Sequence, residues 1–146
     1  MGGVVGLLET KRPGDTAQTP SALAIPGVLA RGLPIVGLAG LLRYFRYQQA
    51  RAKVDIKHPP DAYYIGELDV DPTSRNRGIG AHLLAHAEAE ARAAGIARMA
   101  LCTGVSNPAQ HLYERAGYRI VETRRHADYE RITHNPGRVL MIKDLG

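Results

Sequence analysis

Residues 75–80, of sequence RNRGIG, combine residue types that can bind a phosphate group. The segment lies between an apolar run predicted as a strand and an alanine-rich run predicted as a helix. Glycine lets the backbone approach a ligand closely. The unpaired amides of a first helical turn, together with the helix dipole, favour a bound phosphate. The segment therefore predicts a loop that binds a pyrophosphate, although a lone Gly-x-Gly is weak evidence, because glycine before a helix is more often part of a turn.

Two other nucleotide-binding patterns can be compared with the same residues, and neither fits. A P-loop requires Gly-Lys-Ser/Thr, whereas Gly80 is followed by Ala81 and His82. A dinucleotide fingerprint requires glycine or alanine three residues after its second glycine, and Leu83 stands there. The loop is thus neither of these two types.

Histidine and cysteine offer weaker candidates for chemistry. His82 and His86 are four residues apart on one predicted helix and could share a metal, but no third ligand is evident, so we expect no metal. Cys102 lies in a predicted buried strand, where a thiol is more often a packing residue than a nucleophile.

The helix predicted at residues 78–94 is the clearest element of the chain. Ile79, Leu83 and Ala87 recur at intervals of three to four residues in an alanine-rich segment, and Gly95 ends it as a C-cap. The strand that precedes the loop is predicted at residues 62–70, where apolar and polar residues partly alternate.

The rest of the second half alternates between strands and helices. Asn107 is predicted as an N-cap before Pro108, and Gly117 as a left-handed C-cap. The remaining elements are a turn at 71–74, a strand at 96–103, a helix at 108–116, and strands at 118–125 and 138–145 joined by a long connection containing Asn135-Pro136-Gly137. This order predicts an α/β fold without internal repeats.

The first half is less regular. We expect a strand at residues 4–10, an irregular excursion at 16–34 and a helix at 35–54. Tyr44, Phe45 and Tyr47 on that helix could face an acceptor, although an aromatic stripe at helical spacing is more often part of a core.

Residues 22–42 are apolar over roughly the length of a bilayer crossing. Arg31 would lie in the middle of such a span, and Pro26 and Pro34 would break its helix, so a buried or lid-like segment is favoured.

Composition sets the broad class of the protein. The 146 residues, 45% hydrophobic and 23% charged, predict a single folded domain. The net charge of +5 favours phosphate-bearing ligands of every kind, but without a basic tail it gives no reason to expect a nucleic-acid partner. The single cysteine excludes an internal disulfide, and the N-terminus does not read as a signal peptide, so we expect a cytoplasmic protein outside the membrane.

Two motifs together resemble the GNAT superfamily of acetyl-CoA-dependent N-acetyltransferases. Leu68-Asp69-Val70 followed by residues 75–80 matches motif A of that family, R/Q-x-x-G-x-G/A directly after a strand that ends in apolar-x-Val. Residues 109–118, AQHLYERAGY, match its A-x-x-L-Y-x-x-x-G-F/Y segment, and the resemblance covers roughly residues 62–146. It implies a GNAT-like mixed central sheet flanked by helices.

The resemblance also implies roles for individual residues. Leu68 and Val70 would pair with the pantetheine arm, with the Val70 amide on the thioester carbonyl, and Tyr113 would protonate the departing thiolate. The pyrophosphate of coenzyme A would be bound by the amides around Arg75, Asn76, Arg77, Gly78, Ile79, Gly80 and Ala81.

Three departures from the family pattern affect the details. Where many members have an asparagine seven residues before the tyrosine, this chain has Ser106, with Asn107 one place later. The strand at 96–103 carries no carboxylate, which leaves Glu67 as the best candidate for a general base. The strand and two helices that usually precede the first strand are absent. Either the true start lies upstream, or residues 21–60, with or without a second subunit as in a homodimer, replace them.

From the resemblance we expect one acetyltransferase domain over residues 1–146. Residues 62–146 would be its acetyl-CoA-binding core, and residues 1–61 a divergent acceptor or lid part. It would transfer the acetyl group of its co-substrate to an amine of an acceptor, small molecule or peptide, that the sequence does not identify. The alternative is a coenzyme A-binding regulatory module without catalytic turnover.

Overall fold

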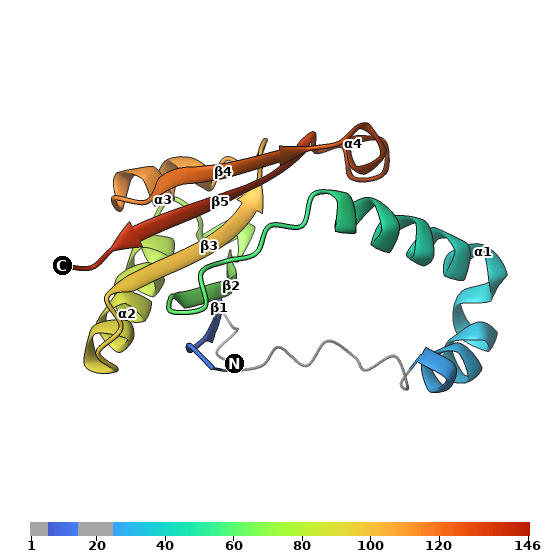
Figure 1. The fold of residues 1–146 in the computed structure, drawn as a ribbon, viewed down its shortest axis with the longest axis horizontal. Coiled ribbons are helices and arrows are strands. Elements are labelled where there is room, and N and C mark those ends of the chain that lie inside the picture. Colours follow the sequence, from blue (N-terminus) through green and yellow to red (C-terminus); the bar gives the residue numbers. More distant parts are fainter. Residues whose placement is uncertain (1–5, 15–24) are drawn as a thin grey trace.

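A computed structural model of the chain describes residues 6–14 and 25–146, with side chains for residues 6–14 and 37–146. Its described residues form a five-stranded sheet with helices around it (Figure 1). The elements are β1 (Gly6–Lys11), α1 (Ile25–Lys53), β2 (Tyr63–Val70), the 3₁₀ turn η2 (Pro72–Ser74), α2 (Ile79–Ala93), β3 (Arg98–Gly104), α3 (Gln110–Arg115), β4 (Arg119–Arg125), α4 (Ala127–Thr133) and β5 (Gly137–Asp144).

The sheet is mixed, with strand order β1-β2-β3-β5-β4. β2 and β3 are parallel, whereas the other neighbouring strands are antiparallel. The β2–β3 pairing is short, because only residues 63–65 are in register with residues 99–101. β2 continues along β1 to Val70, so its last five residues leave β3. The predicted mixed sheet flanked by helices is confirmed.

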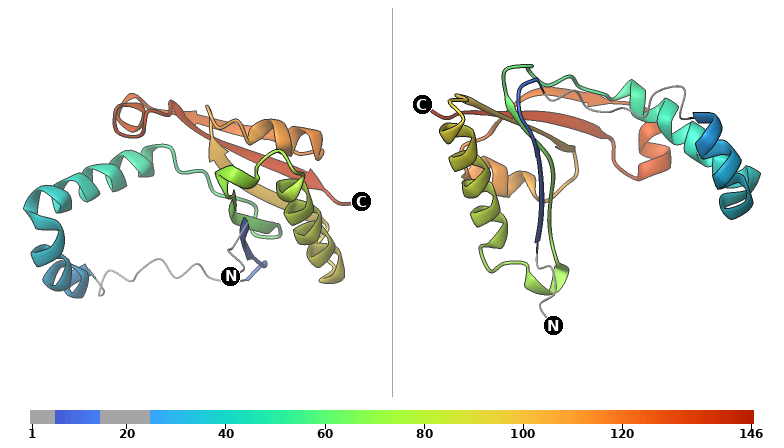
Figure 2. Two further views of the ribbon diagram at one scale, coloured as in Figure 1. Left: turned by 180° about the vertical axis from the view of Figure 1, so that it is seen from behind. Right: turned by 90° about the horizontal axis from the view of Figure 1, so that it is seen from below.

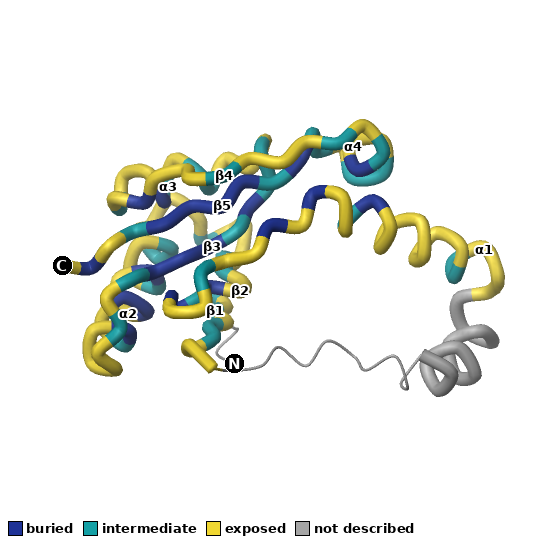
Figure 3. Tube along the Cα trace, in the orientation of Figure 1, coloured by how far each residue is buried: buried dark blue, intermediate teal, exposed yellow. Residues whose placement is uncertain are grey.

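One face of the sheet is covered by α2 and α3, which lie side by side on it (Figure 2). The buried positions follow β3 and β5 through the middle of the sheet (Figure 3). The main core consists of Tyr63, Ile65, Leu84, Ala87, Ala91, Met99, Leu101, Tyr113, Tyr118, Val139, Met141 and Leu145. At about 0.8 kcal/mol per buried CH₂, this core is the principal source of stability.

Helix α1 projects away from the sheet and packs on α4 through its C-terminal end (Figures 1 and 2). Ala50, Val54 and Tyr129 are buried together there, and the Lys53 ammonium lies 2.6 Å from the Asp128 carboxylate. Gly37, at φ 66° and ψ 167°, breaks α1 into two helical segments. No helix of the described chain is long and apolar enough to cross a membrane.

The predicted elements of the second half are confirmed to within one or two residues, and three other expectations need correction. Residues 25–34, expected to be irregular, are helical; Pro26 is tolerated because the amides of a first helical turn have no intrahelical partner. The long connection before β5 contains α4, capped by His126, whose Nδ1 accepts from the Asp128 amide at 3.1 Å. Residues 4–5 and 16–24 lie outside the described residues.

The third correction concerns the aromatic residues of α1. Tyr44, Phe45 and Tyr47 are exposed, as are Leu38 and Leu42, so they are not part of a core among the described residues. Helical spacing predicted the helix, but the stripe meets no covering element because α1 leaves the sheet.

Candidate functional site

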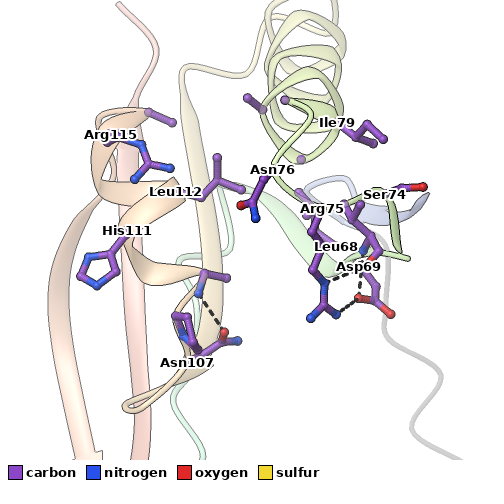
Figure 4. Close-up of a pocket in the computed structure, with 17 residues that line it drawn as sticks. Leu68, Asp69, Ser74, Arg75, Asn76, Ile79, Asn107, His111, Leu112 and Arg115 are labelled. Atoms are coloured by element: carbon purple, nitrogen blue, oxygen red, sulfur yellow. Dashed lines mark hydrogen bonds and ion pairs between the residues drawn. The ribbon is translucent and has the colours of Figure 1, made fainter. Parts of the chain in front are cut away.

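A cleft of about 940 Å³ opens where β2 leaves β3 (Figure 4). It is bounded by the last residues of β2, the loop into α2 and the outer side of α3. Its lining residues are Leu68, Asp69, Val70, Ser74, Arg75, Asn76, Gly78, Ile79, Gly80, Ala81, Asn107, Pro108, Ala109, His111, Leu112, Arg115 and Ala116. The volume lies within the range of ligand pockets.

The separation of β2 from β3 begins at a bulge. Glu9 of β1 is in register with Glu67 and Thr10 with Ile65, which leaves Gly66 without a partner on β1. Bulges bend a strand and strengthen its local twist. The bend therefore directs residues 66–70 away from β3 and leaves their edge facing the cleft.

Val70, at the end of β2, has both backbone polar groups engaged by side chains. Its amide donates to Oδ1 of Asp69 at 2.9 Å, and its carbonyl accepts from Nε of Arg75 at 3.1 Å. The Arg75 guanidinium also lies 3.7 Å from the Asp69 carboxylate. These side chains are all exposed, so a ligand can replace them at small cost.

The N-terminus of α2 forms the second wall of the cleft. Gly78 has a φ of 79°, and no side chain caps the helix there. The first intrahelical bond runs from the His82 amide to the Gly78 carbonyl at 3.0 Å, so the amides of Ile79, Gly80 and Ala81 precede it. This wall therefore presents backbone donors and the positive end of the helix dipole, the arrangement that binds phosphate.

Helix α3 forms the third wall, and its Leu112 side chain reaches the start of α2. A Cβ atom at Gly80 would lie 3.0 Å from Cδ2 of Leu112, and 3.8–3.9 Å from Val70 and Leu68. Glycine at position 80 is thus explained by the close approach of the Leu112 side chain as well as by the loop. Leu112 and Asn76 point toward each other across the cleft (Figure 4).

Several lining residues were not singled out from the sequence, among them Asp69, Ser74, His111 and Arg115. Residues 111, 112, 115 and 116 lie on one face of a helix by their spacing, and Leu112 belongs to the sequence motif. The residues that share a helical face with Leu112 could therefore have been predicted to line the cleft. Arg115 and Arg75 place guanidinium groups on opposite walls, which favours an anionic ligand.

Four residues predicted for the site, Glu67, Arg77, Ser106 and Tyr113, lie outside the cleft lining. Arg77 and Ser106 are exposed and do not line it, whereas Asn107 does, with Oδ1 accepting from the Ala109 amide at 2.9 Å. Glu67 is exposed on β2, opposite Glu9 of β1.

Tyr113 lies on α3 behind the cleft and is only 6% exposed. Its ring packs edge-on against Tyr118, with centroids 6.2 Å apart, and burial raises the pKa of its hydroxyl. No hydrogen bond to that hydroxyl is formed by the residues that the structure describes. Tyr113 is therefore a core residue whose hydroxyl stays protonated at neutral pH.

In the described parts of the chain, no group of three or more side chains that could ligate a metal is found. Nδ1 of His82 lies 3.0 Å from the Gly78 carbonyl, and His86 lies 3.8 Å from Glu90.

Residues 27–118 match the model of the Acetyltransferase (GNAT) family. The mixed sheet, the separation of β2 from β3 and the loop at the start of α2 define an α/β protein of this class, and the chain belongs to the GNAT family. The match begins earlier in the chain than the two sequence motifs and includes most of α1. No curated protein matches the chain significantly.

Solved structures give the same result. The ribosomal-protein-S18-alanine N-acetyltransferase of Escherichia coli is 28% identical over 59% of this chain and 56% of its own, with a TM-score of 0.51. A NatC complex bound to Gag peptide and CoA is 26% identical over 58% of this chain and 52% of its own, also at 0.51. A Bacillus subtilis acetyltransferase in complex with CoA, 24% identical over 61% and 64%, shares the fold at 0.51. The chain thus spans between half and two thirds of these relatives.

Proposed function

We propose that this protein is an N-acetyltransferase that uses acetyl-CoA and transfers its acetyl group to an amine. The observation that carries the proposal is the cleft itself, in which an open strand edge meets the uncapped N-terminus of α2. A strand edge suits the amide-containing pantetheine arm, and free amides at a helix N-terminus suit a pyrophosphate. The 26% identical NatC complex, which was solved with CoA bound, supports this choice of ligand.

The residues of the cleft divide the work by chemistry. The amides of residues 79–81 and the guanidinium groups of Arg75 and Arg115 would hold the phosphates. Leu68 and Leu112 would line the apolar part of the bound arm. The Val70 amide, once released from Asp69, would face the thioester carbonyl and stabilise negative charge that develops on its oxygen. Arg77 and Ser106 would contribute at the rim.

Acetyl-CoA supplies an activated acetyl group, and side chains of the protein donate and accept the protons that move during its transfer. Tyr113 would donate a proton to the departing thiolate, since burial keeps its hydroxyl protonated well beyond neutral pH. Glu67, exposed on the strand beside the cleft, would accept the proton of the attacking amine directly or through water. Residues 62–146 would thus form the acetyl-CoA-binding core, and residues 1–61 would contribute β1 and the acceptor side.

The test is the release of free coenzyme A thiol from acetyl-CoA in the presence of a panel of small amines and peptide N-termini. Amine-dependent release with formation of the acetylated product supports the proposal. Binding of acetyl-CoA without turnover on any amine contradicts the enzymatic function and favours a regulatory coenzyme A-binding module.

A further inference from the structure

The sheet face opposite α2 and α3, here called the second face, carries a separate cluster of functional side chains. The segment after α1 covers part of this face, where Ile56 and Ala62 pack on β3 and β5. Beside that cover, the His58 ring stacks on Tyr64 with centroids 4.1 Å apart. Tyr64 and Cys102 are only partly buried, so this part of the face remains accessible.

Arg138 connects the second face to the gap between β2 and β3. It lies on β5 in register with Gly104, and its Nη2 donates to the Cys102 carbonyl at 3.3 Å. Pairing of β3 with β2 ends at Leu101, so Cys102 is the first residue of β3 beyond it. The Arg138 guanidinium therefore reaches, from the second face, the same gap that the cleft reaches from the α2 face.

Arg51, near the end of α1, adds a second cation. Its Nη1 is fully buried and has no hydrogen-bond partner in the described part of the chain; the nearest carboxylate, on Asp55, is 3.8 Å away. Burial raises the pKa of both Cys102 and Tyr64, and Arg138 and Arg51 both act to lower it. Arg138 thus acts on Cys102 by charge as well as through its hydrogen bond to the Cys102 carbonyl, and Arg51 is the second cation that acts on both side chains. Together, Arg51, Arg138, Tyr64 and Cys102 form what we call the arginine patch.

The carboxylates near the arginine patch pair with other cations, so the positive charge of Arg138 has no carboxylate partner among the described residues. Asp55 and Glu122 also act on Cys102, but Glu122 is paired with Arg124 at 2.7 Å, and the Asp55 carboxylate lies 3.8 Å from Arg51. Within residues 6–14 and 37–146, Arg138 forms no ion pair. A partly buried guanidinium without a carboxylate is suited to an oxyanion, which it can bind through two parallel hydrogen bonds.

We propose that the arginine patch binds an oxyanion of the acceptor, a carboxylate or a phosphate, and holds its amine at the gap between β2 and β3. This inference rests on the proposed acetyl transfer and adds the substrate class, an amine that carries a negatively charged group close to the nitrogen.

Matched amine pairs test the proposal by turnover. Glycine is compared with glycinamide for a carboxylate, and O-phosphoethanolamine with ethanolamine for a phosphate. We expect kcat/KM for at least one anionic member to exceed that of its partner about tenfold or more, as for a hydrogen bond to a charged group. Arg138→Gln should abolish this preference without changing acetyl-CoA affinity. Arg92→Gln, which removes an exposed arginine from α2 on the other face, should keep it.

A second measurement needs no turnover. Cys102 is the only cysteine, so its alkylation by neutral iodoacetamide reports on the arginine patch alone. We expect N-acetylglycine or inorganic phosphate to slow alkylation severalfold in the parent and in Arg92→Gln, and N-acetylglycinamide to have no effect. Arg138→Gln should lose the protection.

The outcomes separate the two proposals. Failure to bind acetyl-CoA overturns the proposed function, and Cys102 protection then decides whether the patch binds oxyanions. Turnover with no preference for anionic amines, or protection that persists in Arg138→Gln, overturns the assignment of the arginine patch while the acetyltransferase activity stands.

Discussion

At the scale of single residues, glycines and two guanidinium groups shape the cleft. Gly78 has a left-handed backbone, and a Cβ placed there would meet only the His82 ring, at 3.7 Å. Gly80 is limited by Leu112 instead. The two glycines of the motif are therefore required for different reasons, one for conformation and one for packing.

Gly78→Asp should lower acetyl-CoA affinity by at least about tenfold, because it places a carboxylate beside amides that would bind a pyrophosphate. Gly95→Asp is the matched control, since Gly95 is also left-handed, at φ 72°, and has open space around it at the far end of α2. Both variants should lose roughly 1 kcal/mol of stability from backbone strain. Equal affinities in calorimetric titrations of the two variants would place the phosphates elsewhere.

Tyr113→Phe should lower kcat by roughly 10 to 1000-fold and leave acetyl-CoA affinity nearly unchanged, because it removes a general acid and keeps the ring. Burial raises the pKa of the Tyr113 hydroxyl above the ordinary tyrosine value near 10. A proton donor must be protonated, so the parent enzyme should lose activity through ionisation of Tyr113 only above pH 10. Rates across pH provide the check. A variant as fast as the parent, with the same high-pH limb, would leave Tyr113 as a core residue alone.

At the scale of elements, the helices and strands that depend on local sequence signals were predicted correctly. The helix at 78–94, the left-handed Gly117 and the strands around them follow from periodicity and turn chemistry, and the structure confirms them. Asn107 was predicted as the N-cap of the next helix, but the N-cap of α3 is Ala109, whose amide donates to the Asn107 side chain. The two sequence motifs also indicated most of the cleft lining, including Leu68, Val70 and residues 78–81.

Other features depend on tertiary packing, or on elements too short to show a pattern, and could not be predicted from local sequence signals. The exposure of Tyr44 and Phe45 depends on the direction in which α1 leaves the sheet, and no spacing within α1 encodes that direction. Helix α4 was missed because its seven residues are too short for a periodic pattern. The arginine patch unites α1, β2, β3 and β5, so only the folded chain brings its members together.

The attachment of α1 to α4 gives an element-scale prediction. Ala50→Asp places a charge in the buried contact with Tyr129, which costs several kcal/mol, so α1 should detach. Hydrogen exchange of amides 38–53 should then accelerate, while acetyl-CoA affinity stays within about twofold, because no described α1 residue lines the cleft. Ala52→Asp, on the exposed side of the same helix, is the control. Equal exchange in the two variants would contradict the docking contact.

At the scale of the whole molecule, buried tyrosines tie stability to pH. Burial raises the pKa of Tyr64, Tyr113 and Tyr118 above the ordinary value near 10. Above pH 10 the unfolded chain therefore loses protons that the folded protein retains, so the free energy of unfolding falls as pH rises. Denaturant titrations from pH 9 to 11 should show this fall, and Tyr118→Phe should reduce its slope. An unchanged slope in that variant would remove Tyr118 from the effect.

At the scale of the whole molecule, thermal unfolding with and without acetyl-CoA tests whether the cleft between β2, α2 and α3 binds this ligand. At a concentration near 100 times Kd, a ligand that binds only the folded state adds about 2.7 kcal/mol. For a chain of this length that predicts a rise in Tm of roughly 5 to 10 °C. Gly78→Asp should show about half of this rise or less, whereas Gly95→Asp should show it in full. A folded parent whose Tm does not change at millimolar acetyl-CoA would contradict the account.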